Sequence, residues 1–358
     1  MKNRATILTA DSRQRKRVHV YVPLIDVHCG FSTYERAIIS RLTSKYDDID
    51  VDAFQFSGFR GNAPVIQLPY LKFKRINLSA DVIFNHRTSG GLLKIVHFIF
   101  RLICPFISFN ILTGYGSDDV YVFFENVLPD IKIKGKTAVI LHDITPLRLK
   151  PVPSRLNQDI YLNEDFIKMY AKIVSNIKKR ADKIITVSDF SRKDIADYLH
   201  MEENKIDIVY NAIDPDNYSR KYDLASMRKK YGLPEKYVLY FGACHMRKNV
   251  EELIRAYALL PEILRREYKL VITNPIDNII FCVNQNGVSK DVVYLYRVPE
   301  EDKPGIYQMA SLFVWPSVYE GFGLPILEAM GAGVPVICSN VTSHPEVAGD
   351  AAILVDPH

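Results

Sequence analysis

The sequence has few cysteines, and they form neither a disulfide framework nor a metal site. Its 358 residues include five scattered cysteines: Cys29, Cys104, Cys244, Cys282 and Cys338. Their number is odd, and no two have the short spacing typical of zinc ligands. We therefore expect buried free thiols in a reducing cytosol.

Long uncharged apolar runs are also missing. The first 17 residues lack an apolar core, so we do not expect a signal peptide. The most apolar segment, residues 91–112, is interrupted by Lys94, His97, Arg101 and Pro105. A membrane span needs about 20 mostly uncharged residues. Because the interruptions share a helix face, the segment is either a core helix or a helix that contacts an anionic membrane surface.

The chain has no strong excess of one charge. Its 46 basic and 41 acidic side chains give a net charge of +5, far below the concentrated basic charge of nucleic-acid binders. The basic cluster RQRKR, residues 13–17, is isolated. We interpret it as a solvated arm, with contact to lipid headgroups as the alternative. No nucleic-acid partner is expected, whereas phosphorylated ligands suit a mildly basic protein.

A dinucleotide-binding fingerprint is absent after the first predicted strand. No G-x-G-x-x-G follows residues 18–24, which argues against a nicotinamide enzyme. Gly30 stands there instead, before a helical pattern. It could admit a ligand close to the backbone, although a plain turn explains it equally well.

What the chain does contain is two sets of short apolar runs that alternate with amphipathic segments. The first set is 18–24, 50–56, 118–125, 136–143, 182–188 and 206–212, and the second is 237–243, 268–274, 291–297, 311–317, 335–340 and 351–357. This alternation predicts parallel sheets with helical crossovers. We predict an α/β protein of two doubly wound domains, residues 1–218 and 219–358, with ligands beyond the carboxyl ends of the strands.

The stretch YEGFGLPILEAM, residues 319–330, follows one of these strands and places two glutamates beside an apolar segment. Its two glycines allow close backbone approach, and Leu324-Pro325 opens a helix whose start favours an anion. We expect a diphosphate at the helix start, a ribose on Glu328 and a hexose near Glu320. The alternative is that both glutamates are solvated surface charges.

Two cations, Arg247 and Lys248, stand just before a helix predicted to begin at about Asn249. Cations at a helix start oppose its dipole unless an anion lies between them. They therefore predict a phosphate site, with a solvated pair as the alternative. No Asp-x-Asp pair lies near them in the sequence to hold Mg²⁺ or Mn²⁺, so we expect metal-independent chemistry without a bound cofactor.

A histidine ends one strand of the first half. In VILHDITPLR, His142 could face the cleft and bond to sugar hydroxyls or to charge that develops in the transition state. The alternative is that His142 is satisfied within a core and that Asp143 caps a turn.

Together these segments resemble the family 4 retaining glycosyltransferases, whose GT-B fold has two Rossmann-like domains facing a cleft. Glu320 and Glu328 are similar to that family's Glu-x7-Glu motif, and FGACHMRKN is similar to its donor-phosphate loop. VILHDITPLR and TSHPEVAGDAAILVDP look most like bacterial enzymes that add mannose to surface polysaccharides. The resemblance covers about residues 20–358, and the family's further helices are missing, so a truncated C-terminal end is expected.

The resemblance implies roles for individual residues. His142 and Glu320 would act on the donor sugar at the reaction centre. The donor-binding set would be Gly30, Arg247, Lys248, Phe322, Gly323, Leu324 and Glu328. Within it the two cations hold the diphosphate and Glu328 the ribose. No side chain resembles a covalent nucleophile, which fits a mechanism in which the leaving phosphate takes the acceptor proton.

The expected function is transfer of mannose, with retention, from GDP-mannose to a glycan or polyprenyl-linked acceptor in surface polysaccharide synthesis. The expected location is the cytoplasm, peripheral on the inner face of the cell membrane. Two alternatives stay open: a sugar-nucleotide epimerase of the same fold, and a non-catalytic carbohydrate-binding or scaffold subunit.

Overall fold

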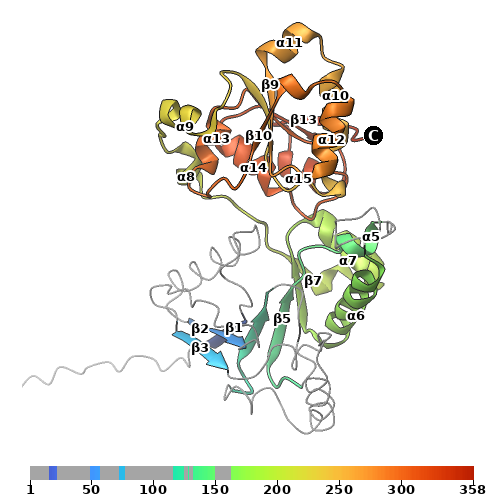
Figure 1. Cartoon of the computed structure of the whole chain (residues 1–358). Coiled ribbons are helices and arrows are strands. Elements are labelled where there is room, and N and C mark those ends of the chain that lie inside the picture. Colours follow the sequence, from blue (N-terminus) through green and yellow to red (C-terminus); the bar gives the residue numbers. More distant parts are fainter. Residues whose placement is uncertain are drawn as a thin grey trace, which may run out of the picture. The chain divides into compact units, whose positions relative to one another are not determined.

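The protein is described from a computed structural model, which defines residues 16–21, 49–56, 72–76, 116–124, 128, 132–149 and 163–358 (Figure 1). By packing, the chain divides into a compact unit of residues 1–139 and a second of residues 140–358. The boundary predicted at residues 218 and 219 stays a prediction.

The first sheet has the strand order β3-β2-β1-β4-β5-β6-β7, and its described pairings are parallel. Its strands are β1 (Lys16–Tyr21), β2 (Ile49–Phe56), β3 (Lys72–Ile76), β4 (Val120–Phe123), β5 (Lys136–Ile140), β6 (Lys183–Thr186) and β7 (Ile206–Ile208). The described helices among them are α5 (Thr145–Arg148), α6 (Glu164–Arg180), α7 (Asp189–Leu199) and the 3-10 turn η3 (Glu203–Lys205).

Local capping chemistry fixes where these helices begin. The Asn163 side chain accepts from the backbone amides of Asp165 and Phe166 at the start of α6. The Ser188 hydroxyl accepts from the amide of Ser191 at the start of α7. Each cap satisfies amides that have no partner inside the helix, which stabilises a helix by roughly 1 kcal/mol.

The second sheet has the order β10-β9-β8-β11-β12-β13, again with parallel pairings. Its strands are β8 (Tyr237–Tyr240), β9 (Lys269–Thr273), β10 (Val292–Leu295), β11 (Leu312–Trp315), β12 (Val336–Ser339) and β13 (Ile353–Val355). The order runs outward in both directions from β8 and β11. Such a reversal is the point at which doubly wound sheets bind ligands.

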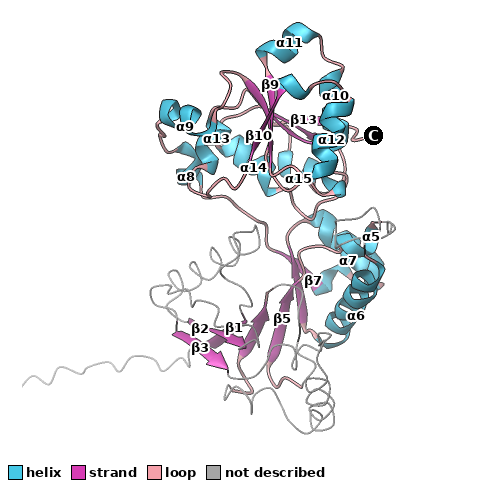
Figure 2. Ribbon diagram, viewed as in Figure 1, coloured by secondary structure: helices cyan, strands magenta, loops and turns pink. Residues whose placement is uncertain are grey.

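Helices cover this sheet on both faces. They are α8 (Pro215–Ser219), α9 (Leu224–Tyr231), α10 (Val250–Ala258), α11 (Glu262–Glu267), α12 (Asp277–Gln285), α13 (Lys303–Gln308), α14 (Leu324–Gly331) and α15 (His344–Ala348), with 3-10 turns η4 (Met246–Lys248) and η5 (Ser289–Asp291). Figure 2 shows α10 and α12 on one side of the strands and α8 and α13 on the other. α14 packs against α8, α13 and α15.

Aromatic side chains fill the core beneath the carboxyl end of β11. Trp315 is 1% exposed and stacks on Tyr240 of β8, with ring centroids 5.3 Å apart. Phe313 stacks on the same tryptophan at 6.0 Å. Stacked pairs of this kind add about 0.5–1.5 kcal/mol to the energy of burial, so the floor of the strand-end region is rigid.

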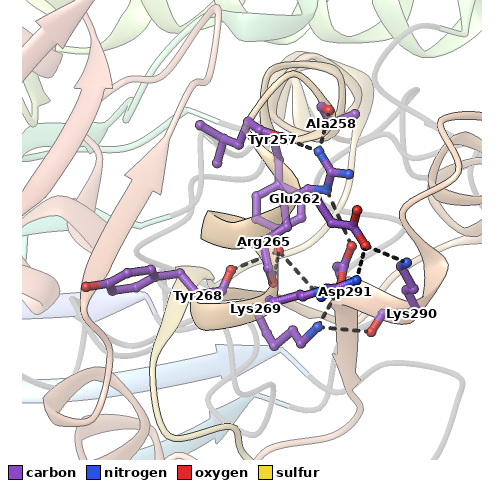
Figure 3. Close-up of polar contacts among 10 residues, drawn as sticks. Tyr257, Ala258, Glu262, Arg265, Tyr268, Lys269, Lys290 and Asp291 are labelled. Carbon is purple, nitrogen blue, oxygen red and sulfur yellow. Dashed lines mark hydrogen bonds and ion pairs between the residues drawn. The ribbon is translucent and has the colours of Figure 1, made fainter.

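The amino ends of β9 and β10 carry a buried ionic cluster (Figure 3). The Asp291 carboxylate is 1% exposed and lies 2.6 Å from Lys269 Nζ and 3.4 Å from Arg265 Nε. Burial opposes ionisation, but the two cations hold the pKa of Asp291 below its usual range. Arg265 also donates to the carbonyl of Ala258 at 3.0 Å. The cluster therefore ties α11 to the sheet at the edge opposite the carboxyl ends of the strands.

The sequence-based expectation of two parallel α/β sheets is confirmed, and each of the twelve predicted runs overlaps a strand. One strand was missed. β3, KFKRI, is basic at three of its five positions, so it shows little apolar character. It lies at the end of the strand order, and edge strands tolerate charge well.

Candidate functional site

The loops that follow β8 and β11 meet at the carboxyl edge of the second sheet. The two strands are parallel neighbours, with Leu312 opposite Val238. Beyond them, the amide of Val318 donates to the carbonyl of Arg247 at 2.8 Å. Because this bond joins the two loops, the predicted cation pair is held beside the predicted glutamate.

Glu320, Arg247 and Lys248 form one buried ionic cluster. Arg247 Nη1 lies 2.8 Å from Glu320 Oε2, and Lys248 Nζ bonds to Glu320 Oε1. Arg247 also donates to the carbonyl of Tyr319 at 3.0 Å. Lys248 Nζ lies 4.4 Å from the centroid of the Trp315 ring, a cation–π contact that aligns the ammonium over the core. Three residues predicted to share a site are thus in direct contact.

Burial and charge pull the ionisation of this cluster in opposite directions. Glu320 is 8% exposed and Lys248 is 9% exposed. Burial raises the pKa of Glu320, but Arg247 and Lys248 overcome it and hold that pKa well below its usual range. Burial lowers the pKa of Lys248 to about 8, although Glu320 partly offsets this. At neutral pH the cluster holds two cations and one anion, and so attracts a further anion.

Backbone geometry at the start of α14 requires glycine. Gly323 precedes the helix with φ 104° and ψ 48°, a region that side chains avoid. A Cβ there would lie 3.1 Å from His344 Cδ2, and one at Gly321 would lie 2.8 Å from Asp143 Cβ. Leu324 opens the helix, whose start carries positive partial charge beside the cation pair. The predicted start of the helix at Leu324-Pro325 is confirmed.

Serine hydroxyls fix the loop between Glu320 and α14. Ser343 Oγ lies 3.0 Å from the carbonyl of Glu320 and 2.7 Å from that of Phe322. Ser188 and Ser191 both donate to the carbonyl of Gly321, at 2.6 and 3.0 Å. These serines were not predicted, because a serine that bonds to a distant carbonyl leaves no pattern in sequence.

His142 lies in the same compact unit, close to this loop. Its carbonyl would be 3.0 Å from a Cβ at Gly321, and it accepts from Thr186 Oγ1 at 3.1 Å. The side chain is 5% exposed, and burial lowers the pKa of His142 to about 4. The imidazole is therefore neutral near pH 7. Asp143 Oδ1 accepts from the Thr145 amide at 2.9 Å, as the turn-capping alternative predicted. Contact of His142 with a sugar stays a prediction.

Glu328 lies one turn into α14, and its carboxylate faces α13. Lys303 Nζ bonds to Glu328 Oε1, and Tyr307 Oη donates to Oε2 at 3.1 Å. Burial opposes protonation of Lys303, but Glu328 and Glu300 raise its pKa above the usual value. Glu328 is 7% exposed and bonds to Lys303 and Tyr307, so it is not a solvated surface charge. Lys303 escaped prediction because it lies in the polar run PEEDK, which resembles an ordinary surface turn.

Gly30, the apolar segment 91–112 and residues 13–15 of the basic cluster lie outside the described residues. Within the described ranges there is no cluster of three or more histidine, cysteine or acidic residues that could hold a metal ion. Of the described helices, none combines the length and apolar character needed to cross a bilayer.

Two family profiles match the chain one after the other. "Glycosyltransferase Family 4" matches residues 136–217, and "Glycosyl transferases group 1" matches residues 225–358. The chain thus contains two glycosyltransferase family domains in succession. The second profile includes the cation pair and both glutamates.

Several curated relatives are mannosyltransferases. "O-antigen chain mannosyltransferase B" of Escherichia coli is 40% identical over 204 residues, which are 55% of this chain and 54% of the relative. "Serotype-specific mannosyltransferase WbdA" of Escherichia coli is 30% identical over 267 residues, 72% of this chain and 31% of the relative. "O-antigen chain mannosyltransferase RfbU" of Salmonella typhimurium is 24% identical over 283 residues, which are 77% of this chain and 71% of the relative. The chain thus spans about half, or less, of the first two relatives.

Solved structures support the fold. Sucrose-phosphate synthase from Thermosynechococcus elongatus aligns with a TM-score of 0.68 at 18% identity, over 96% of this chain and 86% of its own. WaaG, a glycosyltransferase involved in lipopolysaccharide biosynthesis, aligns with a TM-score of 0.63 at 18% identity, over 92% and 83%. The predicted GT-B fold is confirmed, and the predicted truncation of the C-terminal end stays a prediction.

Proposed function

We propose that this glycosyltransferase moves mannose from GDP-mannose to a glycan or polyprenyl-linked acceptor in bacterial surface polysaccharide synthesis. The observation that carries the proposal is the cluster of Glu320, Arg247 and Lys248 at the start of α14. The names of the relatives support mannose as the sugar. Contact with the inner face of the cell membrane is part of the proposal and rests on residues 91–112 and 13–17 of the sequence.

In this proposal each charged group has one task. Arg247, Lys248 and the α14 start neutralise the donor diphosphate. Glu320 orients the sugar, and Glu328 accepts from the ribose hydroxyls. The bond between the anomeric carbon and the diphosphate breaks while the acceptor oxygen attacks the same face. The acceptor proton passes to the leaving phosphate oxygen, so no covalent intermediate forms and the configuration is retained.

Thermal shift against GDP-, UDP- and ADP-sugars tests the donor. We expect GDP-mannose to give the largest shift, because a ligand at about 100 times its dissociation constant stabilises by about 2.7 kcal/mol. A larger shift with a UDP- or ADP-sugar would overturn the choice of donor. Binding without transfer to any acceptor would favour a non-catalytic subunit. Nucleotide release without an acceptor would favour an epimerase.

Chelation tests the role given to the cations. We expect donor binding and transfer to persist in EDTA, because two cations and a helix start compensate the diphosphate charge. Initial rates with and without EDTA measure this. Activity that is lost on chelation and restored by Mn²⁺ would contradict the proposal.

A further inference from the structure

A second buried lysine–glutamate pair, Lys303 and Glu328, links α13 to α14. Lys303 begins α13, and its side chain is 14% exposed, while the Glu328 side chain is 9% exposed. Taking such a pair out of water costs several kcal/mol, so it is not a simple source of stability. The burial of this pair therefore calls for an explanation other than stability.

The Lys303 ammonium contacts groups of the chain itself. Nζ bonds to Glu328 Oε1, lies 3.3 Å from Glu300 Oε1 and lies 5.6 Å from the centroid of the Phe241 ring. Two of its three hydrogens thus have carboxylate acceptors. The contact that links Lys303 to α14 is its bond to Glu328.

Glu328 keeps acceptor capacity. Its two oxygens offer about four lone-pair positions. The groups that face it are Lys303 and Tyr307 of α13, Tyr218 of α8 and Glu300 before α13. Lys303 is the cation among them. Its bond to Glu328 Oε1 therefore fixes the orientation of the carboxylate.

We propose that Lys303 is a positioning residue for nucleotide recognition. It holds the Glu328 carboxylate in one orientation, so that the acceptor capacity left beside Lys303, Tyr307 and Tyr218 is aimed at a ribose hydroxyl. This inference rests on the proposed function, because it needs a nucleotide at the start of α14.

The test compares ligands that differ only in the ribose hydroxyls. The dissociation constant is measured by calorimetry for GDP, UDP and ADP, and the tightest is paired with its 2′,3′-dideoxy analogue. We expect wild type to prefer the ribonucleotide by about tenfold or more, the value of one charge-assisted hydrogen bond. In Lys303→Met this preference should fall to about one, while the affinity for the dideoxy analogue stays within about twofold, as expected if only ribose contacts are lost.

Two further variants separate positioning from stability. Lys303→Arg keeps the charge and should restore most of the preference. Lys269→Met removes a cation from another buried carboxylate, Asp291, at the opposite edge of the sheet (Figure 3). It should lower thermal stability without changing the preference. The dideoxy analogue reports on an intact phosphate site, so loss of its binding would show that a Lys303→Met sample is unfolded. The ribose preference would then be compared between Lys303→Arg and Lys303→Gln.

The possible outcomes separate the role of Lys303 from the role of Glu328 and from the proposed function. A ribose preference that survives in Lys303→Met or Lys303→Gln overturns the role of Lys303 and leaves the proposed function intact. A wild type without ribose preference removes both the Glu328 assignment and this inference. If none of the three nucleotides binds, the proposed function itself fails.

Discussion

Replacing Lys248 by methionine is expected to weaken binding of GDP-mannose by tenfold to a hundredfold. A charge-assisted hydrogen bond contributes about 1.5–3 kcal/mol, and each 1.4 kcal/mol is about tenfold in affinity. Methionine removes the ammonium and its cation–π contact with Trp315 but keeps an apolar side chain of similar length in that space, which alanine would not. Arg247 still pairs with Glu320 at 2.8 Å, so the buried carboxylate keeps a partner and the fold should persist.

A surface lysine provides the matched control. Lys236 pairs with Glu267 at 2.6 Å and lies over the Tyr268 ring, but its side chain is half exposed. Exposed pairs contribute about 0–1 kcal/mol, so Lys236→Met should leave donor affinity unchanged. Equal affinities in wild type and a folded Lys248→Met protein would remove the phosphate role of Lys248.

The same lysine gives donor binding a pH signature. Burial lowers the pKa of Lys248 to about 8 in the free protein, and a bound diphosphate would raise it. Below pH 8 the ammonium is already present, so affinity should be flat. As pH rises above 8 the free protein loses this proton, and affinity should fall by up to about tenfold per pH unit. Titrations from pH 6.5 to about 9.5 should show the fall in wild type and not in Lys248→Met.

Placement of the site could be predicted from sequence because it follows from sheet topology. Apolar runs located the strands, and ligands of parallel sheets bind where the strand order reverses. That rule places Lys248 and Glu320, 72 positions apart, in one region. What the sequence did not predict is that the cations assigned to the phosphates are also the partners of Glu320. A pattern along the chain shows which loops meet, but not which atoms bond across them.

Burial of the polar residues was the harder part. Glu328 and Lys303 belong to separate helices, and the sequence gives no sign that they face one another. His142 is an ordinary strand-end residue in sequence, yet it is 5% exposed and neutral. In each case the deciding quantity is the desolvation of a side chain by elements far along the chain. Local patterns do not record it.

The two glutamates of YEGFGLPILEAM should respond differently when each is replaced by glutamine. Glu320→Gln removes the anion that neutralises Arg247 and Lys248. The freed cations should keep, or raise, affinity for GDP. Transfer should nevertheless fall by about a hundredfold, because an interaction made mainly with the sugar in the transition state is lost.

Glu328→Gln should show the opposite pattern. Glutamine keeps one acceptor oxygen but loses the charge that pairs with Lys303 and strengthens bonds to the ribose. Free GDP carries that ribose, so the affinity of Glu328→Gln for GDP should be about tenfold lower than that of wild type. Calorimetry with GDP and a transfer assay at saturating donor measure the two effects separately. If the glutamates were merely surface charges, both variants would stay close to wild type in binding and in rate. That result would contradict the donor site. Glu320 is buried and paired with two cations, and Glu328 is buried and paired with Lys303. Removing the charge of either carboxylate should therefore change binding or rate.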